Sequence, residues 1–186
     1  MTRIVAGRFG GRRLQVPSGG RVRPTSDRVR EALFSRLETL VHLAGARVAD
    51  LYAGSGAVGL EAYSRGAGHV LLVESSPRAA RAARANIEAL GASAHVRLVT
   101  ASVMSTLAAG ADEPYDVVFA DPPYDLPDRQ ITELQHALLD GGWLAPGAVV
   151  VIERSSRGAP VEWVEPVTDL SVRRYGETAL WYGRRT

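Results

Sequence analysis

The stretch VADLYAGSGAVG, residues 48–59, decides the fold of this chain. Its first part, Val48–Tyr52, predicts a strand, and residues 57–65 predict a helix that follows at once. The first two glycines allow a ligand to approach the backbone closely, and Gly59 allows the helix to pack near the strand. A strand, a glycine-rich turn and a helix in this order predict a ligand site in a Rossmann-like unit.

The loop also matches the dinucleotide fingerprint G-x-G-x-x-G over residues 54–59. Glu74, twenty residues past Gly54, stands where an acid would hold a ribose diol, although an exposed strand-end carboxylate is the alternative. The motif alone does not distinguish NAD from S-adenosylmethionine. Asp50 favours S-adenosylmethionine, because a carboxylate near the loop would repel a pyrophosphate but suits an ammonium and a sulfonium.

The rest of the chain repeats the pattern of strand and helix. The further strands are expected at 70–73, 96–99, 117–120 and 149–152, and the further helices at 77–90, from 103 and over 128–139. This alternation predicts a mostly parallel sheet covered by helices on both faces. Residues 169–174 and 178–183 predict an antiparallel hairpin at the end of the chain. The expected fold class is therefore α/β, a doubly wound and mostly parallel seven-stranded sheet.

The first 45 residues form an extension to this unit. Residues 3–5 and 12–16 predict a small β-hairpin, and one of Thr25, Ser26 and Asp27 is expected to cap the helix that follows. We expect the extension over 1–45 and the catalytic domain over 46–186. An independently folded first domain is disfavoured, because one hairpin and one helix would barely sustain a core.

Positive charge is concentrated at the beginning of the chain. Between residues 1 and 30, eight arginines stand against the single acid Asp27, a net charge of +7 in a chain whose total is +2. All 22 basic residues are arginines, which suit bidentate contacts with phosphate and guanine edges. A solvated charge run is the alternative, but such asymmetry is typical of nucleic-acid binding. The arginines expected to contact nucleic acid are Arg3, Arg8, Arg12, Arg13, Arg21 and Arg23.

Composition excludes several other kinds of site. The chain has no cysteine, which removes disulfides, thiolate nucleophiles and zinc–thiolate centres. The histidines show no ligand-type spacing, so no metal is expected; they are His42, His69, His95 and His136. No apolar stretch approaches the roughly 18 residues of a membrane span, and no signal-peptide core precedes the fold. We therefore expect a cytoplasmic protein without a membrane contact, and a monomer.

The tetrapeptide Asp121-Pro122-Pro123-Tyr124, directly after the strand at 117–120, suggests a site that methylates an amino group on a base. An exocyclic base amine is a poor nucleophile, so a catalyst must accept hydrogen bonds from both of its N–H groups. Asp121 supplies one acceptor and the carbonyl of Pro122 the other, with the prolines fixing φ. Tyr124 can stack on the base. A strand-ending turn is the alternative. Both this motif and the glycine loop follow parallel strands, so they are expected to face one another.

In this order of elements the chain resembles the bacterial family that methylates N2 of a guanine in 16S ribosomal RNA. The most specific stretch is residues 23–34, RPTSDRVREALF, and residues 50–62 are similar to the family's cofactor loop. The resemblance runs nearly end to end. It implies a class I methyltransferase fold, S-adenosylmethionine as donor, and guanine 966 of 16S RNA in the small ribosomal subunit as target.

The resemblance also implies roles for individual residues. Asp121 and Pro122 hold the guanine amine, and Tyr124 covers the ring. The cofactor-binding residues are Thr25, Asp50, Gly54, Ser55, Gly56, Glu74, Ser75, Ser102 and Val103. Ser102 departs from the family, which tends to have Asp or Asn for the adenine amine at this position. Thr25 ends a segment that is either a helix cap or a lid over the cofactor.

Three other functions remain open at this point. A DNA methyltransferase acting on adenine N6 or cytosine N4 would use the same tetrapeptide, because it serves any planar base amine. An NAD-dependent oxidoreductase would use the same glycine loop, although no proton-relay residue is evident. A non-enzymatic RNA-binding assembly factor would retain the fold, but Glu74, Asp121 and Tyr124 are all present, which disfavours it.

Overall fold

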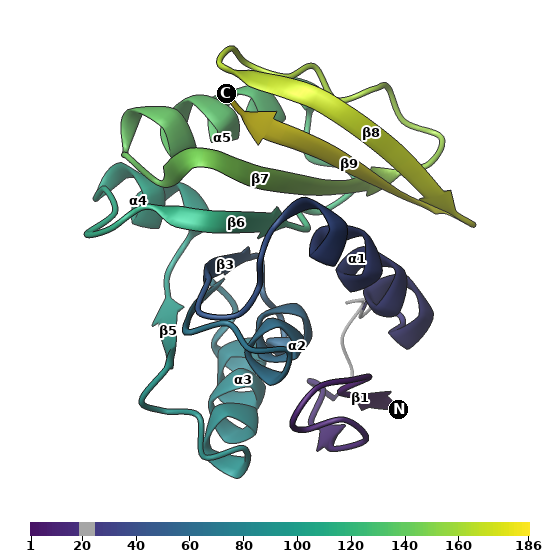
Figure 1. Cartoon of the computed structure of the whole chain (residues 1–186), viewed down its shortest axis with the longest axis vertical. Helices are drawn as coiled ribbons and strands as arrows, with labels where there is room; N and C mark the ends of the chain where they lie inside the picture. Colours follow the sequence, from purple (N-terminus) through teal and green to yellow (C-terminus); the bar gives the residue numbers. More distant parts are fainter. Residues whose placement is uncertain (19–24) are drawn as a thin grey trace.

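The structure, a computed structural model, describes residues 1–18 and 25–186, and a seven-stranded sheet lies at its centre (Figure 1). The strands of this sheet are β3 (Arg47–Leu51), β4 (His69–Glu74), β5 (Val96–Thr100), β6 (Tyr115–Ala120), β7 (Leu144–Ser155), β8 (Val167–Tyr175) and β9 (Thr178–Arg185). The helices are α1 (Asp27–Leu40), α2 (Ala57–Ser64), α3 (Pro77–Ala89), α4 (Val103–Ala108) and α5 (Asp128–Asp140). None of these helices is long and apolar enough to cross a membrane.

The strand order is β5-β4-β3-β6-β7-β9-β8. Strands β3 to β7 are parallel to one another, and β9 is antiparallel to both β7 and β8. The predicted seven-stranded sheet and its antiparallel end are therefore confirmed. The chain runs outward from β3 through β4 to β5 and then returns to β6 on the other side of β3. In open α/β sheets ligands bind at such a switch point, outside the carboxyl ends of the strands.

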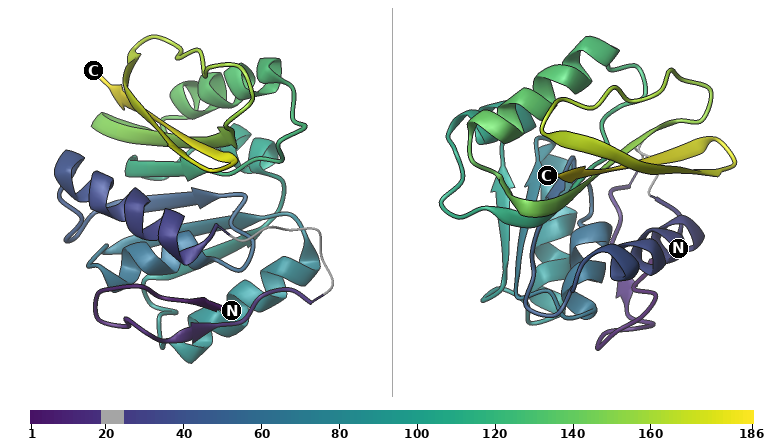
Figure 2. Two further views of the ribbon diagram at one scale, coloured as in Figure 1. Left: turned by 90° about the vertical axis from the view of Figure 1, so that its right-hand side faces the viewer. Right: turned by 45° about the horizontal axis from the view of Figure 1, so that its top comes forward.

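Helices cover both faces of the sheet, as the alternation predicted (Figure 2). Val117 and Phe119 of β6 pack into a core that includes residues of α1, α2 and α3. Val118 and Ala120 pack into the opposite core, which includes residues of α4 and α5. Successive side chains of a strand point to opposite faces, so strands buried on both faces consist mainly of apolar residues, as in residues 70–73 of β4 and 117–120 of β6.

The N-terminal hairpin is shorter than the sequence predicted. Its strands are β1 (Thr2–Arg3) and β2 (Arg13–Leu14). Ile4 still forms backbone hydrogen bonds with Gly11 and Arg12, but from Val5 onward the backbone bonds to α2. The backbone N–H groups of Val5 and Ala6 donate to the carboxylate of Glu61 at 2.8 and 3.0 Å. Ile4 of the hairpin lies in the same core as α1, α2 and α3. The boundary predicted at residue 45 remains a prediction.

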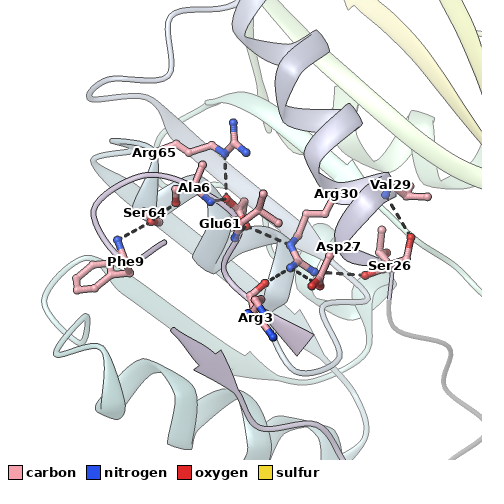
Figure 3. Close-up of polar contacts among 12 residues, drawn as sticks. Arg3, Ala6, Phe9, Ser26, Asp27, Val29, Arg30, Glu61, Ser64 and Arg65 are labelled. Atoms are coloured by element: carbon pink, nitrogen blue, oxygen red, sulfur yellow. Dashed lines mark hydrogen bonds and ion pairs between the residues drawn. The ribbon is translucent and has the colours of Figure 1, made fainter. Parts of the chain in front are cut away.

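Glu61 is the centre of a buried network of charges that joins the hairpin, α1 and α2 (Figure 3). Its oxygens also accept from Nε of Arg30 at 3.2 Å and Nε of Arg65 at 3.0 Å. The side chains of Glu61 and Arg30 are fully buried. Arg30 also bonds to Asp27 at 2.9 Å and to the carbonyl of Arg3. Buried charges persist when they are paired and hydrogen-bonded, as they are here.

Ser64, one turn further along α2, holds the tip of the hairpin. Its Oγ accepts from the backbone N–H of Phe9 at 2.9 Å and donates to the carbonyl of Ala6 at 2.7 Å. Gly7 adopts a φ of +80°, and a Cβ there would lie 2.1 Å from the Ser64 carbonyl oxygen. Only glycine allows this close approach. The hairpin is thus fixed to the catalytic unit at several points.

We predict that Glu61→Ala strongly destabilises the protein. The substitution removes the acceptor of two backbone N–H groups and one of the acceptors of the buried Arg30 guanidinium, and it leaves that charge without its buried partner. Breaking a buried pair in this way costs about 3–5 kcal/mol of the free energy of unfolding, measurable by urea denaturation. Glu133→Ala is the matched control, because its side chain is 53% exposed and its pair with Arg129 spans 3.4 Å. Its expected cost is below about 1 kcal/mol, and equal losses in the two variants would contradict the role of Glu61.

Candidate functional site

The site lies where β3 and β6 end side by side. Leu51 and Ala120 are partners in the parallel register, and the backbone N–H of Asp121 donates to the carbonyl of Leu51 at 3.3 Å. A cavity opens beyond these ends. Val16, Pro17 and Thr25 of the extension line one part of it. The rest of the lining includes Asp50 of β3, residues 52–55 of the glycine loop, Phe119 of β6, and Asp121 directly after β6. The prediction that the two motifs face one another is confirmed.

The glycine loop owes its shape to unusual backbone angles. Tyr52 has a φ of +62°, a rare value for a residue with a side chain, and it lies directly after β3. Gly54 and Gly56 have φ values of +57° and +84°. A Cβ on Gly59 would lie 2.3 Å from Cδ2 of Leu72, which confirms that this glycine allows α2 to pack near the sheet.

Glu74 anchors the glycine loop. One of its carboxylate oxygens accepts from the backbone N–H of Gly54 and the other from that of Ser76, both at 2.7 Å. It is thus a bonded carboxylate rather than a free strand-end acid. Glu74 is not part of the cavity lining, and Ser75 beside it is exposed. Their contact with a ribose remains a prediction.

Asp50 lines the cavity but is also bound to the helix that follows. It is 2% exposed, and its Oδ2 accepts from the backbone N–H of Gly59 at 2.9 Å. Burial raises the pKa of Asp50 to about 7, the Gly59 hydrogen bond opposes this rise, and the charge of Glu74 adds to it. The sequence did not predict the hydrogen bond between Asp50 and Gly59 of α2. A contact between Asp50 and the cofactor's ammonium remains a prediction.

Arg154 binds the backbone of the Asp-Pro-Pro-Tyr loop, and the sequence analysis did not identify this residue. This side chain, 7% exposed at the end of β7, donates to the carbonyls of Pro123 at 3.0 Å, Leu126 at 2.7 Å and Tyr124 at 3.5 Å. Pro122 is buried, whereas Tyr124 is 40% exposed. The guanidinium thus fixes the loop's backbone while the tyrosine ring stays accessible.

Glu153 is a second residue that sequence reasoning missed. It is 5% exposed, and its two oxygens accept from the hydroxyls of Tyr124 and Thr25, each at 3.3 Å. Tyr124 also shares a hydrogen bond of 3.2 Å with Thr178. An acid directly after the apolar run 149–152 was a usable signal, since Glu74 and Asp121 were found by the same pattern.

Three acids of adjacent strands, Asp50, Asp121 and Glu153, lie on the same face of the sheet at its carboxyl edge. Their proximity matters most for Asp121. Burial raises the pKa of Asp121 well above its usual range, the charges of Glu153 and Asp50 raise it further, and Arg154 opposes the rise. An acid in this environment holds a proton more readily than an exposed aspartate.

Two of the predicted adenine contacts lie away from the cavity lining. Ser102 caps α4, because its Oγ accepts from the backbone N–H of Ser105 at 3.1 Å. Val103 is buried in the core that includes α5. Neither residue lines the cavity. A role for them in cofactor binding remains a prediction.

Four of the six arginines predicted to contact nucleic acid lie in the described residues, and all four are exposed. Arg3, Arg8, Arg12 and Arg13 all face solvent, while the predictions for Arg21 and Arg23 fall outside the described residues. Residues 23 and 24, the first part of the segment expected to act as a helix cap or a lid, also fall outside the described residues. Ser26 is the helix cap: its Oγ accepts from the backbone N–H of Val29 at 3.2 Å.

Comparisons with known proteins match this architecture over nearly the whole chain. The family model described as conserved hypothetical protein 95 matches residues 2–184. Ribosomal RNA small subunit methyltransferase D of Escherichia coli (strain K12) is 39% identical over 151 residues, which cover 81% of this chain and 73% of that protein.

Solved structures agree with the sequence comparison. The yhhF protein from Escherichia coli is 35% identical, with a TM-score of 0.84 over 99% of this chain and 97% of that chain. The structure of SMU.776, complexed with SAH, shares the fold alone, at 18% identity and a TM-score of 0.65 over 84% of this chain and 48% of that one. This chain therefore belongs to the conserved hypothetical protein 95 family, the family of ribosomal RNA small subunit methyltransferase D.

Proposed function

We propose that this protein transfers a methyl group from S-adenosylmethionine to the exocyclic N2 amine of guanine 966 in 16S ribosomal RNA. Its substrate is the small ribosomal subunit or an assembly intermediate, and it acts in the cytoplasm as a monomer without a metal. One observation carries the proposal: the glycine loop and Asp121 line a single cavity. The relative named as a small-subunit ribosomal RNA methyltransferase supports the substrate class.

The cavity has open space, a carboxylate and apolar surface for S-adenosylmethionine. A Cβ built on Gly54 would meet no protein atom within 4 Å, so the loop leaves open space beside its backbone. Asp50 provides a carboxylate for a cationic ligand, and Val16 and Pro17 provide apolar surface. When bound, S-adenosylmethionine supplies a methyl group that is electrophilic because it is carried on a sulfonium.

The Asp-Pro-Pro-Tyr loop positions the target amine. The carboxylate of Asp121 and the carbonyl of Pro122 accept its two N–H groups, which directs the nitrogen lone pair toward the methyl group. Tyr124 stacks on the base. Its hydroxyl donates to Glu153 and shares a second hydrogen bond with the Thr178 hydroxyl, and these two bonds fix the direction of the ring. Holding both reactants in line supplies most of the acceleration.

The family relationship distinguishes this function from the other candidates. The matched relative is named for ribosomal RNA, which does not favour DNA adenine N6 or cytosine N4 as the target. It is named as a methyltransferase, which does not favour an NAD-dependent oxidoreductase or a non-enzymatic assembly factor. The choice of guanine N2 rests on the family resemblance, because the Asp-Pro-Pro-Tyr motif serves any planar base amine.

Asp121→Asn should abolish most methyl transfer while leaving cofactor binding nearly unchanged. The amide is neutral and has one acceptor oxygen in place of two, so it holds the amine more weakly than the carboxylate does, and we expect turnover to fall by roughly 10²-fold or more. The measurement is transfer of labelled methyl groups to small subunits that lack the modification, with cofactor affinity from calorimetry. Asp125→Asn, in the same loop but exposed, is the control. Equal losses in turnover and cofactor affinity would refute the assigned role.

Methyl transfer should depend on pH through Asp121. The carboxylate is a stronger acceptor for the amine than the protonated acid, so the rate should fall as the pH falls through the raised pKa of Asp121. Glu153→Gln removes one of the charges that raise this pKa, and the amide can still hydrogen-bond to Tyr124 and Thr25. We therefore expect the acid limb of the pH–rate profile to move to lower pH. An acid limb at the same pH in the variant and the wild type would show that Glu153 does not affect the pKa of Asp121.

Glu74→Ala should weaken cofactor binding more than it slows turnover at saturating cofactor. The substitution frees the backbone N–H groups of Gly54 and Ser76, so the glycine loop loses its anchor. Calorimetric titration with S-adenosylmethionine provides the affinity. The control is Glu88→Ala, an exposed acid on α3 that should bind the cofactor as the wild type does. Unchanged affinity in the Glu74 variant would exclude its part in the cofactor site.

A further inference from the structure

Helix α3 carries an arginine at every third position of its first half. Arg78, Arg81 and Arg84 are exposed, whereas the alanines between them are buried. The helix thus has a core face made of small residues and a solvent face made of guanidinium groups. The predicted RNA-binding residues all lay within the first 30 residues of the chain, so this row is an additional basic feature.

The row is not neutralised by nearby acids. Within residues 1–18 and 25–186, no carboxylate forms an ion pair with Arg78, Arg81 or Arg84. By contrast, Arg129 of α5 is paired with Glu133 at 3.4 Å. Such unneutralised guanidinium groups are suited to bind phosphate.

The N-terminal hairpin lies alongside α3, which brings a second set of arginines next to the row (Figure 2). The backbone N–H of Gln15 donates to Oδ1 of Asn86 at 2.7 Å, and Nδ2 of Asn86 donates back to the Gln15 carbonyl at 3.0 Å. Arg12 donates to the carbonyl of Ala89 at 2.8 Å. Because Arg12 and Arg13 are both exposed, the hairpin and α3 present one basic surface.

This surface is connected directly to the cavity. Asn86, 2% exposed, donates from Nδ2 to the carbonyl of Ser55 in the glycine loop at 2.9 Å. The row begins at Arg78, two residues after Ser76, whose N–H bonds to Glu74. At a rise of about 1.5 Å per residue, Arg84 lies roughly 9 Å further along the helix axis. The arginines therefore lead from the cavity end of the sheet away along α3.

We infer that Arg78, Arg81 and Arg84 of α3, together with Arg12 and Arg13, form one phosphate-binding surface for the RNA strand that flanks the target base. The inference rests on the proposed function. Phosphate contacts position a nucleic acid without reading its sequence. Because the surface is tied to the glycine loop through Asn86, it fixes the distance between the bound backbone and the cavity that receives the base.

The test is a triple variant, Arg78→Gln, Arg81→Gln and Arg84→Gln. Glutamine has a helix propensity close to that of arginine, so α3 should persist, which circular dichroism checks. The measurement is binding to unmodified small subunits across a salt series, together with KM and kcat for methyl transfer. Losing three phosphate contacts should make the slope of log K against log salt shallower by roughly 2. KM should rise more than kcat falls, and the affinity for S-adenosylmethionine should be unchanged.

Arg129→Gln, an exposed arginine on the opposite face of the sheet, is the matched control and should leave the salt slope unchanged. If the triple variant has the same salt slope and KM as this control, the inferred phosphate-binding surface is wrong, while the methyl-transfer proposal is unaffected. If the wild type binds subunits but transfers no methyl group, the proposed function fails. A shallower slope in the triple variant would then still establish the surface.

Discussion

The side-by-side ends of β3 and β6 determine where the rest of the site lies. Leu51 and Ala120 pair in parallel register, so the glycine loop and the Asp-Pro-Pro-Tyr loop leave the sheet at the same level. The hydrogen bond from Asp121 to the Leu51 carbonyl joins the two loops where they begin. Because the chain crosses over between these strands, no helix covers the space above them, and a cavity can form there. The electrostatic coupling of Asp121 to Asp50 and Glu153 follows from the same register.

The extension is fixed to this framework by two buried polar side chains. Glu61 binds the hairpin backbone and Arg30 of α1, while Asn86 binds the hairpin and the glycine loop together. Arg30 belongs to the basic stretch of the sequence, yet it is buried and serves the fold. Exposed arginines on the hairpin and on α3 carry the proposed RNA contacts instead. Hydrogen bonds thereby join the proposed RNA surface to the glycine loop, which suits an enzyme that must receive a single base from a large substrate.

Most of the sheet could be predicted from the sequence, because parallel strands buried on both faces read as short apolar runs between helical segments. The glycine loop, Glu74 and Asp121 were found because each follows such a run. Glu153 gives the same signal within β7, directly after the apolar run 149–152, but its importance depends on the register of β7 against β6, which no local pattern reveals. The hydrogen bond between Asp50 and Gly59 and the burial of Arg30 could not be predicted from the sequence either, since both depend on tertiary packing. Ser102 was assigned through a family position, whereas local geometry makes it the cap of α4.

The identity of the methylated nucleoside tests this account most directly. The protein is incubated with methyl-labelled S-adenosylmethionine and small ribosomal subunits that lack the modification, with naked 16S RNA and duplex DNA alongside, and the products are digested. The account predicts N2-methylguanosine from the subunits, located at guanine 966. Label in N6-methyladenine or N4-methylcytosine, or no label despite saturable binding of the cofactor, would contradict it.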